Sequence, residues 1–226
     1  MKRLALGLAL SLILAGTAMA ASNELTRAEK AAGWKLLYDG KSLAGWRGFK
    51  APAPDKGWTA DGVLSPDPKT SKDIITKDQF ESFELTWQWK ISPKGNSGVM
   101  FHVLEVGDET YESGPEYQIL DNAHGEPPPQ RAGSLFALYA PSQDVPKPVG
   151  EWNDARLVVD HGKVQHWLNG VKVVEYEIGS PDFKARVDHS KFRQWPQFAT
   201  GKTGHIALQN HGDPVWFRDL KIRVIK

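Results

Sequence analysis

The most regular pattern along this chain is an alternation of apolar and polar residues with a period of two. Between Phe83 and Ile91, apolar residues occupy every second position, with Glu, Thr, Gln and Lys between them. This period predicts a β-strand with one buried and one exposed face. Asn169-Gly170 separates two such runs and predicts a tight hairpin. The other predicted strands are 35–38, 99–104, 116–120, 135–139, 157–160, 164–168, 171–176, 205–209 and 216–224, with 157–176 forming a three-stranded meander.

Helical signals are restricted to the N-terminal part of the chain. The segment Ser22–Ala32 has helix-forming composition, with Thr26 and Glu29 spaced as a capping box. Many short strands punctuated by Gly and Pro, with one short helix, predict an all-β sandwich or jelly roll. Long loops at 51–72 and 180–202, and a proline-rich one at 123–132, are either functional rims or mobile segments.

The first twenty residues are typical of a secretory signal. Lys2 and Arg3 precede a mainly apolar run from Leu4 to Leu14, and Ala18-Met19-Ala20 resembles a cleavage site. We therefore predict a signal peptide at 1–20, a single domain at 21–226, and a periplasmic or secreted protein. No later stretch has the roughly 18 to 20 apolar residues that a membrane span needs, and no cysteine is present for lipid attachment.

Composition narrows the classes of function. The absence of cysteine excludes disulfides, thiol catalysis and thiolate metal sites. Without the signal, 26 basic residues face 27 acidic ones, which argues against a nucleic-acid partner. The chain has no Gly-x-Ser-x-Gly, P-loop, Rossmann or His-Glu-x-x-His motif. Nine tryptophans can fill a core or stack on sugar rings, and we expect both uses.

The segment Gly114–Asp121 carries the first candidate chemistry. Alternation places Glu116 and Gln118 on one face, opposite Tyr117, with Asp121 where the strand ends. A glutamate on a strand is more often only solvent-exposed than catalytic. Here Gln118 on the same face and the acid at the strand end favour a site, because two nearby carboxyl groups can divide acid and base roles.

The segment Gly204–Gly212 is the second candidate. Its alternation places His205, Gln209 and His211 on a polar face, with apolar residues between them directed to the core. Two histidines and an amide can bind a metal, transfer protons or hydrogen-bond a sugar. We expect His205 to be a packed or surface ring, whereas His211 is equally compatible with a functional role.

The segment Gly95–His102 and the last strand supply the remaining polar candidates. Asn96 either shapes the turn or contributes to the site. Gly98 and His102 are predicted on one face, and His102 belongs to the site if that face is the open one. Arg218 serves an anionic oxygen or forms a surface ion pair.

Several longer motifs, taken together, resemble one known family. They are Gly33–Gly40 through Leu43–Trp46, Gly95–Gly98, Gly114–Asp121, Gly150–Asn153, Trp167–Val171, and Gly204–Gly212 through Phe217–Asp219. In this order, over nearly all of the chain after the signal, they resemble the 3-keto-disaccharide hydrolase domain family. The resemblance implies a concanavalin A-like jelly roll of two antiparallel sheets with a concave polar face. His102 departs from the pattern, since the family often carries Arg there.

The activity that the resemblance implies is cleavage of glycosides oxidised at C3. A C3 ketone acidifies the C2 proton, so the anomeric substituent leaves by elimination and water adds to the enone. This route needs a base, an acid for the departing oxygen, and a donor or cation for the enolate. Direct hydrolysis by two carboxylates is the close alternative. A non-catalytic carbohydrate-binding module and a structural envelope module remain open, since the same fold serves each.

Under the elimination route, we assign roles to residues as hypotheses. The catalytic set is Glu116 as base, with Asp121 or His211 as acid. The substrate-binding set is Gln118, Gln209, Asn96, His102, Arg218, Trp46 and Tyr139. A divalent metal held by Glu116, Asp121 and His211 is an alternative source of enolate stabilisation. The expected partner is an oligosaccharide or glycoside, with no nucleic acid and no membrane span, and the oligomeric state is left open.

Overall fold

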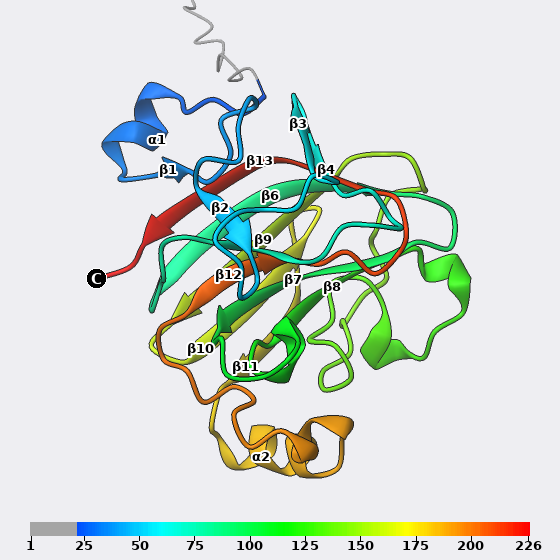
Figure 1. Ribbon diagram of the computed structural model, residues 1–226. Helices are drawn as coiled ribbons and strands as arrows, with labels where there is room; N and C mark the ends of the chain where they lie inside the picture. The colour runs from blue at the N-terminus through cyan, green and yellow to red at the C-terminus, as the bar shows by residue number, and fades with distance from the viewer. Residues whose placement is uncertain (1–21) are drawn as a thin grey trace, which may run out of the picture.

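Two antiparallel sheets pack face to face in the computed structural model, which describes residues 22–226 (Figure 1). The predicted signal at 1–20 lies outside the described residues. The larger sheet contains β1 (Lys35–Leu36), β3 (Thr59–Asp61), β4 (Val63–Ser65), β6 (Phe83–Ile91), β9 (Asn153–Asp160), β10 (Lys163–Leu168), β11 (Val171–Glu177) and β13 (Val215–Val224). The smaller sheet contains β2 (Trp46–Gly48), β5 (Ile74–Thr76), β7 (Asn96–Val103), β8 (Glu116–Leu120) and β12 (His205–Leu208).

The strand order of each sheet places residues that are distant in the chain side by side. The larger sheet runs β11-β10-β9-β6-β13-β4-β3, with β1 paired to β13, and the smaller runs β2-β5-β12-β7-β8. The strands of residues 22–226 pair in the antiparallel sense throughout, which confirms the prediction of an all-β sandwich of antiparallel sheets. No helix of the described part is long and apolar enough to cross a bilayer.

Alternation along the strands builds the core between the sheets. On β6, the side chains from Phe83 to Trp89 that face inward are all at most 2% exposed, as the period of two predicts. From the smaller sheet, Val99, Tyr117 and Ile206 enter the same core. The opposite face of the smaller sheet carries a second, smaller apolar cluster and the polar groups of the candidate site.

The described residues also form several short helices. They are α1 (Arg27–Ala31), α2 (Pro181–Asp188), and the 3-10 turns η1 (Thr110–Glu112), η2 (Asn122–His124), η3 (Pro128–Gln130) and η4 (Lys191–Gln194). The predicted capping box is present at α1, where Thr26 and Glu29 bond each other's backbone N–H groups. Figure 1 shows α2 at the end of the molecule away from α1.

Three predictions of secondary structure are wrong. The expected loop at 51–72 contains the paired strands β3 and β4. The expected strand at 135–139 is a tight turn, because the carbonyl of Leu135 accepts hydrogen bonds from the N–H groups of Leu138 and Tyr139. The expected loop at 180–202 contains α2 and η4. Ser180 caps α2 through the N–H of Phe183, and Pro181 occupies the first turn, which is a common helix start.

A β-bulge in β7 changes which side chains face the core. His205 of β12 pairs with Val103, whereas Ala207 pairs with Met100, so β7 has one extra residue between these positions. His102 takes a left-handed backbone conformation with φ of 52°. Val103 thereby shares the outer face with Met100, and the predicted alternation through His102 is not maintained.

Candidate functional site

Glu116, the first residue of β8, is the most unusual ionisable group of the outer face of the smaller sheet. Its side chain and backbone together are only 6% exposed. Within residues 22–226, no hydrogen bond reaches its carboxyl group, although buried carboxylates ordinarily accept several. Burial raises the pKa of Glu116 to about 8, against the opposing effect of the Lys191 ammonium and with a further increase from Asp73. This carboxyl group can therefore exchange a proton near neutral pH.

Gly98 of β7 makes the space in which the Glu116 side chain lies. A Cβ atom at Gly98 would lie 2.1 Å from Glu116 Oε1 and 2.7 Å from its Cδ and Cγ atoms. The carboxyl group thus lies directly against the backbone of the neighbouring strand. A side chain at position 98 would have to displace it, so the glycine is a steric requirement of this arrangement.

Two glutamines flank Gly98, one on each neighbouring strand. Gln118 is its register partner on β8, and the N–H of Gln209, which follows β12, donates to the carbonyl of Gly98 at 3.0 Å. Both side chains are buried, and the Oε1 atom of each has no hydrogen-bond partner among the described residues. A buried acceptor without a partner is costly, so these oxygens are prepared to accept hydrogen bonds from a ligand.

Asp73, immediately before β5, supplies a second carboxyl group with a shifted pKa. Thr110 Oγ1 donates to one of its oxygens at 2.5 Å, and the N–H of Asn210 donates to the other at 2.9 Å. Burial raises the pKa of Asp73 to about 6, although these two hydrogen bonds favour its ionised form. Asp73 is thus held in a fixed orientation and raises the pKa of Glu116 through its negative charge.

Lys191, the first residue of η4, brings a positive charge to this region. Its Nζ atom lies 4.6 Å from the ring centroid of Phe136, 5.3 Å from that of Tyr111 and 5.4 Å from that of Phe192. These are cation–π distances. Partial burial lowers the pKa of Lys191, and the charge of Glu116 acts in the opposite direction.

An apolar floor separates Glu116 from a second polar cluster. Along one row across the sheet, Arg47, Ile75, Ala207, Met100 and Glu116 stand opposite one another in register. The three middle residues are fully buried. With neighbouring strands about 4.8 Å apart, Arg47 and Glu116 lie on the order of 19 Å from each other.

Arg47 and His205 organise the second cluster. Arg47 forms a bidentate pair with Glu105 at 2.6 and 2.7 Å, which lowers the pKa of Glu105 to about 2. His205 Nδ1 donates to the carbonyl of Thr76 at 2.7 Å, because a carbonyl can only accept. Its Nε2 faces Arg47 at 3.3 Å and Gln79 at 3.0 Å. His205 is thus a packed, hydrogen-bonded ring, which the sequence predicted as one of two options.

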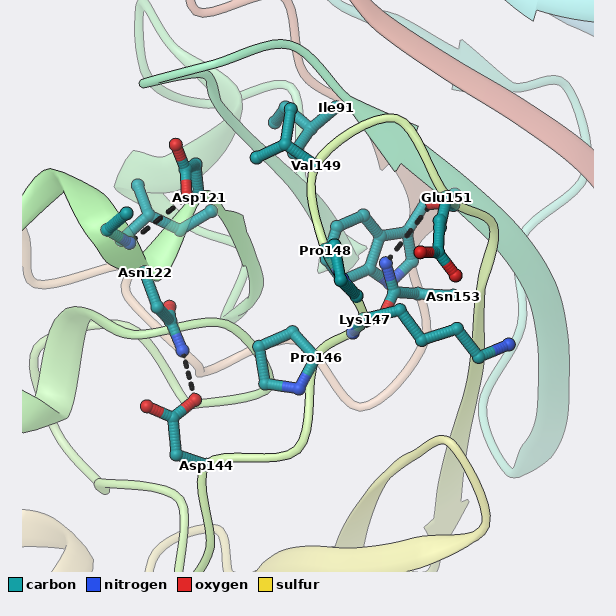
Figure 2. Close-up of a pocket in the computed structure, with 13 residues that line it drawn as sticks. Ile91, Asp121, Asn122, Asp144, Pro146, Lys147, Pro148, Val149, Glu151 and Asn153 are labelled. Carbon is teal, nitrogen blue, oxygen red and sulfur yellow. Dashed lines mark hydrogen bonds between the residues drawn. The ribbon is translucent and has the colours of Figure 1, made fainter.

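Asp121 and His211 do not join Glu116. Asp121 is five residues further along an extended strand, about 16 Å away, and its two oxygens accept from the N–H groups of Lys94 and Ala123. Figure 2 shows Asp121 in a pocket that Glu116 does not line, with Asn122 beside it and the segment 147–153 opposite. His211 is exposed in the turn before β13. Both were predicted as the acid, and the geometry places neither in that role.

The predicted metal site is not assembled by these residues. Across residues 22–226, no group of three or more His, Asp or Glu side chains lies close enough to hold a metal ion together. Glu116, Asp121 and His211 therefore do not form a common metal site.

Two polar residues predicted for substrate binding point elsewhere. Because of the bulge in β7, His102 packs edge-on against Phe83 and Phe101 on the core side, and its Nε2 donates to the carbonyl of Glu81 at 2.8 Å. Arg218 lies on the outer face of the larger sheet. There it donates to Gln88 at 2.7 Å and covers the ring of Trp152 at 4.1 Å.

The two predicted aromatic contacts are structural, and Asn96 stays at the edge of the site. Trp46 is 1% exposed in the core and donates through Nε1 to the carbonyl of Leu37. Tyr139 stacks on Tyr176 and donates to Asp182 at 2.6 Å. Asn96 begins β7 two residues before Gly98, so alternation places it on the same face.

Asp73, Thr110 and Lys191 were missed by reasoning from the sequence. The sequence contains one hint for Asp73, because it lies two residues before Ile75 and next to the core residue Ile74, as an outward-facing residue would. However, β5 has only three residues, which is too few to reveal an alternation with a period of two. Lys191 has no local signal, because η4 and β8 are brought together only by the tertiary fold.

Comparisons with known proteins agree with one another. The sequence profile of the 3-keto-alpha-glucoside-1,2-lyase-like domain matches residues 33–223. A 3-keto-disaccharide hydrolase of Bacteroides thetaiotaomicron is 32% identical over 85% of this chain and 79% of its own length. Two candidate glycosyl hydrolases of Parabacteroides distasonis have similar crystal structures. The first has a TM-score of 0.85 at 34% identity, covering 91% of this chain and all of that one. The second has a TM-score of 0.70 at 31% identity, covering 85% and 99%.

Proposed function

The chain belongs to the 3-keto-alpha-glucoside-1,2-lyase-like domain family and is an enzyme that cleaves glycosidic bonds, and from this membership we propose that its substrates are glucosides oxidised to a ketone at C3. Glu116 supports this proposal most strongly. Its carboxyl group is buried, has no hydrogen-bond partner in residues 22–226, and has a pKa of about 8. Two amide oxygens beside it lack partners as well. Such an arrangement suits proton abstraction from a carbon atom next to a carbonyl group.

In this proposal, the ionised Glu116 removes the proton at C2 of the keto sugar. The C–H electron pair forms the C2–C3 double bond, and the carbonyl π pair moves onto the C3 oxygen as an enolate. When the enolate collapses, the C1–O bond breaks, and the departing oxygen takes a proton from an acid. Water then adds to the enone, so the net reaction is hydrolysis of the keto glycoside to a keto sugar and an alcohol.

We assign the acid role to Asp73 in place of Asp121 or His211. Because its pKa is raised to about 6, Asp73 keeps a proton to a higher pH than an ordinary aspartate does, which an acid requires. The hydrogen bonds from Thr110 and Asn210 hold the carboxyl group in one orientation. The amide groups of Gln118 and Gln209 orient the sugar through its hydroxyl groups, because their side-chain oxygens are available as acceptors.

The substrate class is tested with a chromogenic glucoside and its 3-keto derivative, each incubated with the purified protein with and without EDTA. We expect nitrophenol release from the keto derivative alone, since only a C3 ketone acidifies the C2 proton. Cleavage of the unmodified glucoside alone would instead support direct hydrolysis by Glu116 and Asp73. Release from neither substrate would contradict the proposed substrate class. EDTA sensitivity would show a metal requirement that the described residues do not explain.

The pH dependence follows from the same carboxyl group. A base works only when ionised, and the C2 proton is removed before the step that uses the acid. When this removal limits the rate, kcat/KM for the keto glucoside is expected to rise with pH, with an apparent pKa of about 8. Well below that value, the rate should fall about tenfold per pH unit. Initial rates from pH 5.5 to 9.5 measure this, and intrinsic tryptophan fluorescence at each pH confirms that the protein remains folded. A flat profile from pH 6 to 9 would remove Glu116 from the role of base.

We also propose that the protein is exported. The charged start, apolar run and small-residue site within residues 1–20 support this, and N-terminal sequencing of the protein from a periplasmic or culture fraction is the direct measurement. A mature chain beginning near Ala21 is the expected result.

A further inference from the structure

The elimination route needs a positive charge or a donor near the developing enolate, and the structure places the predicted Arg218 on the wrong sheet face. Arg218 covers Trp152 on the outer face of the larger sheet, whereas Glu116 lies on the outer face of the smaller one. The cation that acts on Glu116 is Lys191, whose positive charge lowers the pKa of this carboxyl group and so favours its ionisation.

Two of the aromatic residues that contact Lys191 also contact the part of the sheet around Glu116. The N–H of Phe136 donates to the backbone carbonyl of Glu116 at 3.1 Å. Tyr111 packs on the apolar floor that contains Met100, the register partner of Glu116. Since Lys191 Nζ lies within 5.3 Å of both ring centroids, its ammonium group is held over the same part of the sheet.

The backbone of Lys191 is anchored independently of its side chain. Ser190 accepts a hydrogen bond from the N–H of Phe192 at 3.1 Å and donates to the carbonyl of Val187 at 2.9 Å. Phe192 is 2% exposed and stacks on Phe198 with ring centroids 4.0 Å apart. The packed turn thus fixes the backbone from which the exposed Lys191 side chain extends, and the three rings place its ammonium group. A charge placed before substrate arrives stabilises an oxyanion with little reorganisation.

We propose that Lys191 is a catalytic residue of this site, whose ammonium group stabilises the oxyanion that forms on the substrate when Glu116 removes its proton. This rests on the proposed function, because it takes Glu116 as the base. A cation held against aromatic rings keeps its charge while it loses part of its hydration. A neighbouring oxyanion therefore replaces water as its partner, and the enolate is favoured over the ketone.

The test compares Lys191→Met, Lys191→Arg and Lys184→Met in the full chain with the keto glucoside. Lys184 is an exposed lysine of the neighbouring helix α2 and serves as the matched control for loss of one positive charge. We expect Lys191→Met to lower kcat by about 10- to 100-fold with little change in KM, since the stabilised charge exists only in the transition state. Lys191→Arg should recover much of the rate, and Lys184→Met should match the wild type. Thermal unfolding establishes that each variant is folded.

A second readout separates an electrostatic role from a structural one and requires no turnover. Loss of the ammonium group should raise the pKa of Glu116, measured by 13C NMR titration of its carboxyl carbon, and should move the acid limb of the rate profile to higher pH. Unchanged kcat together with an unchanged pKa of Glu116 in Lys191→Met would overturn the proposal. If Glu116→Gln retained full activity, the proposed function itself would fail. If Glu116→Gln is inactive but Lys191→Met is not, only the role of Lys191 fails.

Discussion

Glu116→Gln is expected to lower kcat/KM for a keto glucoside by about 10³-fold, because glutamine keeps the shape of the side chain but cannot accept the proton. Steady-state kinetics of the purified variant measures this. The matched control is Glu81→Gln, which neutralises an exposed carboxyl group on the surface and should leave the rate unchanged. Activity of Glu116→Gln within tenfold of the wild type would assign the base to another residue.

The same substitution is expected to stabilise the fold at high pH. The pKa of Glu116 is about 8 in the folded chain against an ordinary value of 4.5. The folded state therefore holds this proton while the unfolded chain releases it, and stability falls as pH rises from about 4.5 through 8. Removing the ionisable group should raise the unfolding free energy at pH 9 by about 3 to 5 kcal/mol.

Urea unfolding at two pH values measures this gain. At about pH 3.5, a full unit below the ordinary pKa of 4.5, Glu116 is largely protonated in both the folded and the unfolded chain, so wild type and Glu116→Gln should differ little. At pH 9, the variant should unfold at a clearly higher urea concentration. An equal difference at both pH values would mean that packing, and not ionisation, accounts for the effect.

Gly98→Ala is expected to lower kcat/KM by about 100-fold by moving the base. The new methyl group would lie 2.1 Å from Glu116 Oε1, so the carboxyl group must rotate away, and a shift of about 1 Å at a reacting group can cost this much. Gly45→Ala is the control, since its Cβ would make only an ordinary contact at 3.6 Å with the carbonyl of Leu37. The kinetics of both variants are measured with the keto glucoside.

A double-mutant cycle identifies the cause. If Gly98→Ala acts through Glu116, it should add almost nothing to the loss already present in Glu116→Gln. An additive loss would show that the methyl group obstructs the substrate directly. Either result also indicates how close the sugar approaches the backbone of β7.

The sandwich itself was predictable because its signals are local. The period of two from Phe83 to Ile91 places apolar side chains in the core, and Asn169-Gly170 closes the hairpin between β10 and β11. The capping box at Thr26 could be predicted in the same way, from two residues three positions apart. Each of these features depends on residues within a few positions of one another, so a single sequence contains the necessary information.

The candidate site was only partly predictable because it forms across strands. Glu116, Gln118 and Gln209 share one face as alternation predicted, since each lies on or next to a regular strand. Asp121 was misplaced, because nearness along an extended strand is not nearness in space. Lys191 and Asp73 enter from segments whose approach depends on the packing of whole elements, and no local pattern records that approach.

The bulge in β7 has a consequence for comparing this chain with its relatives. It places two consecutive side chains, Phe101 and His102, on the core side, so the positions before and after it follow opposite parity. Before the bulge the even-numbered side chain of Met100 faces outward, and after it the odd-numbered side chain of Val103 does. The residues of β7 after the bulge therefore align in three dimensions with those of a relative only if the relative has the same extra residue or the alignment has a gap there. Deleting His102 would restore a single alternation, with Phe101 still in the core and Val103 still on the outer face.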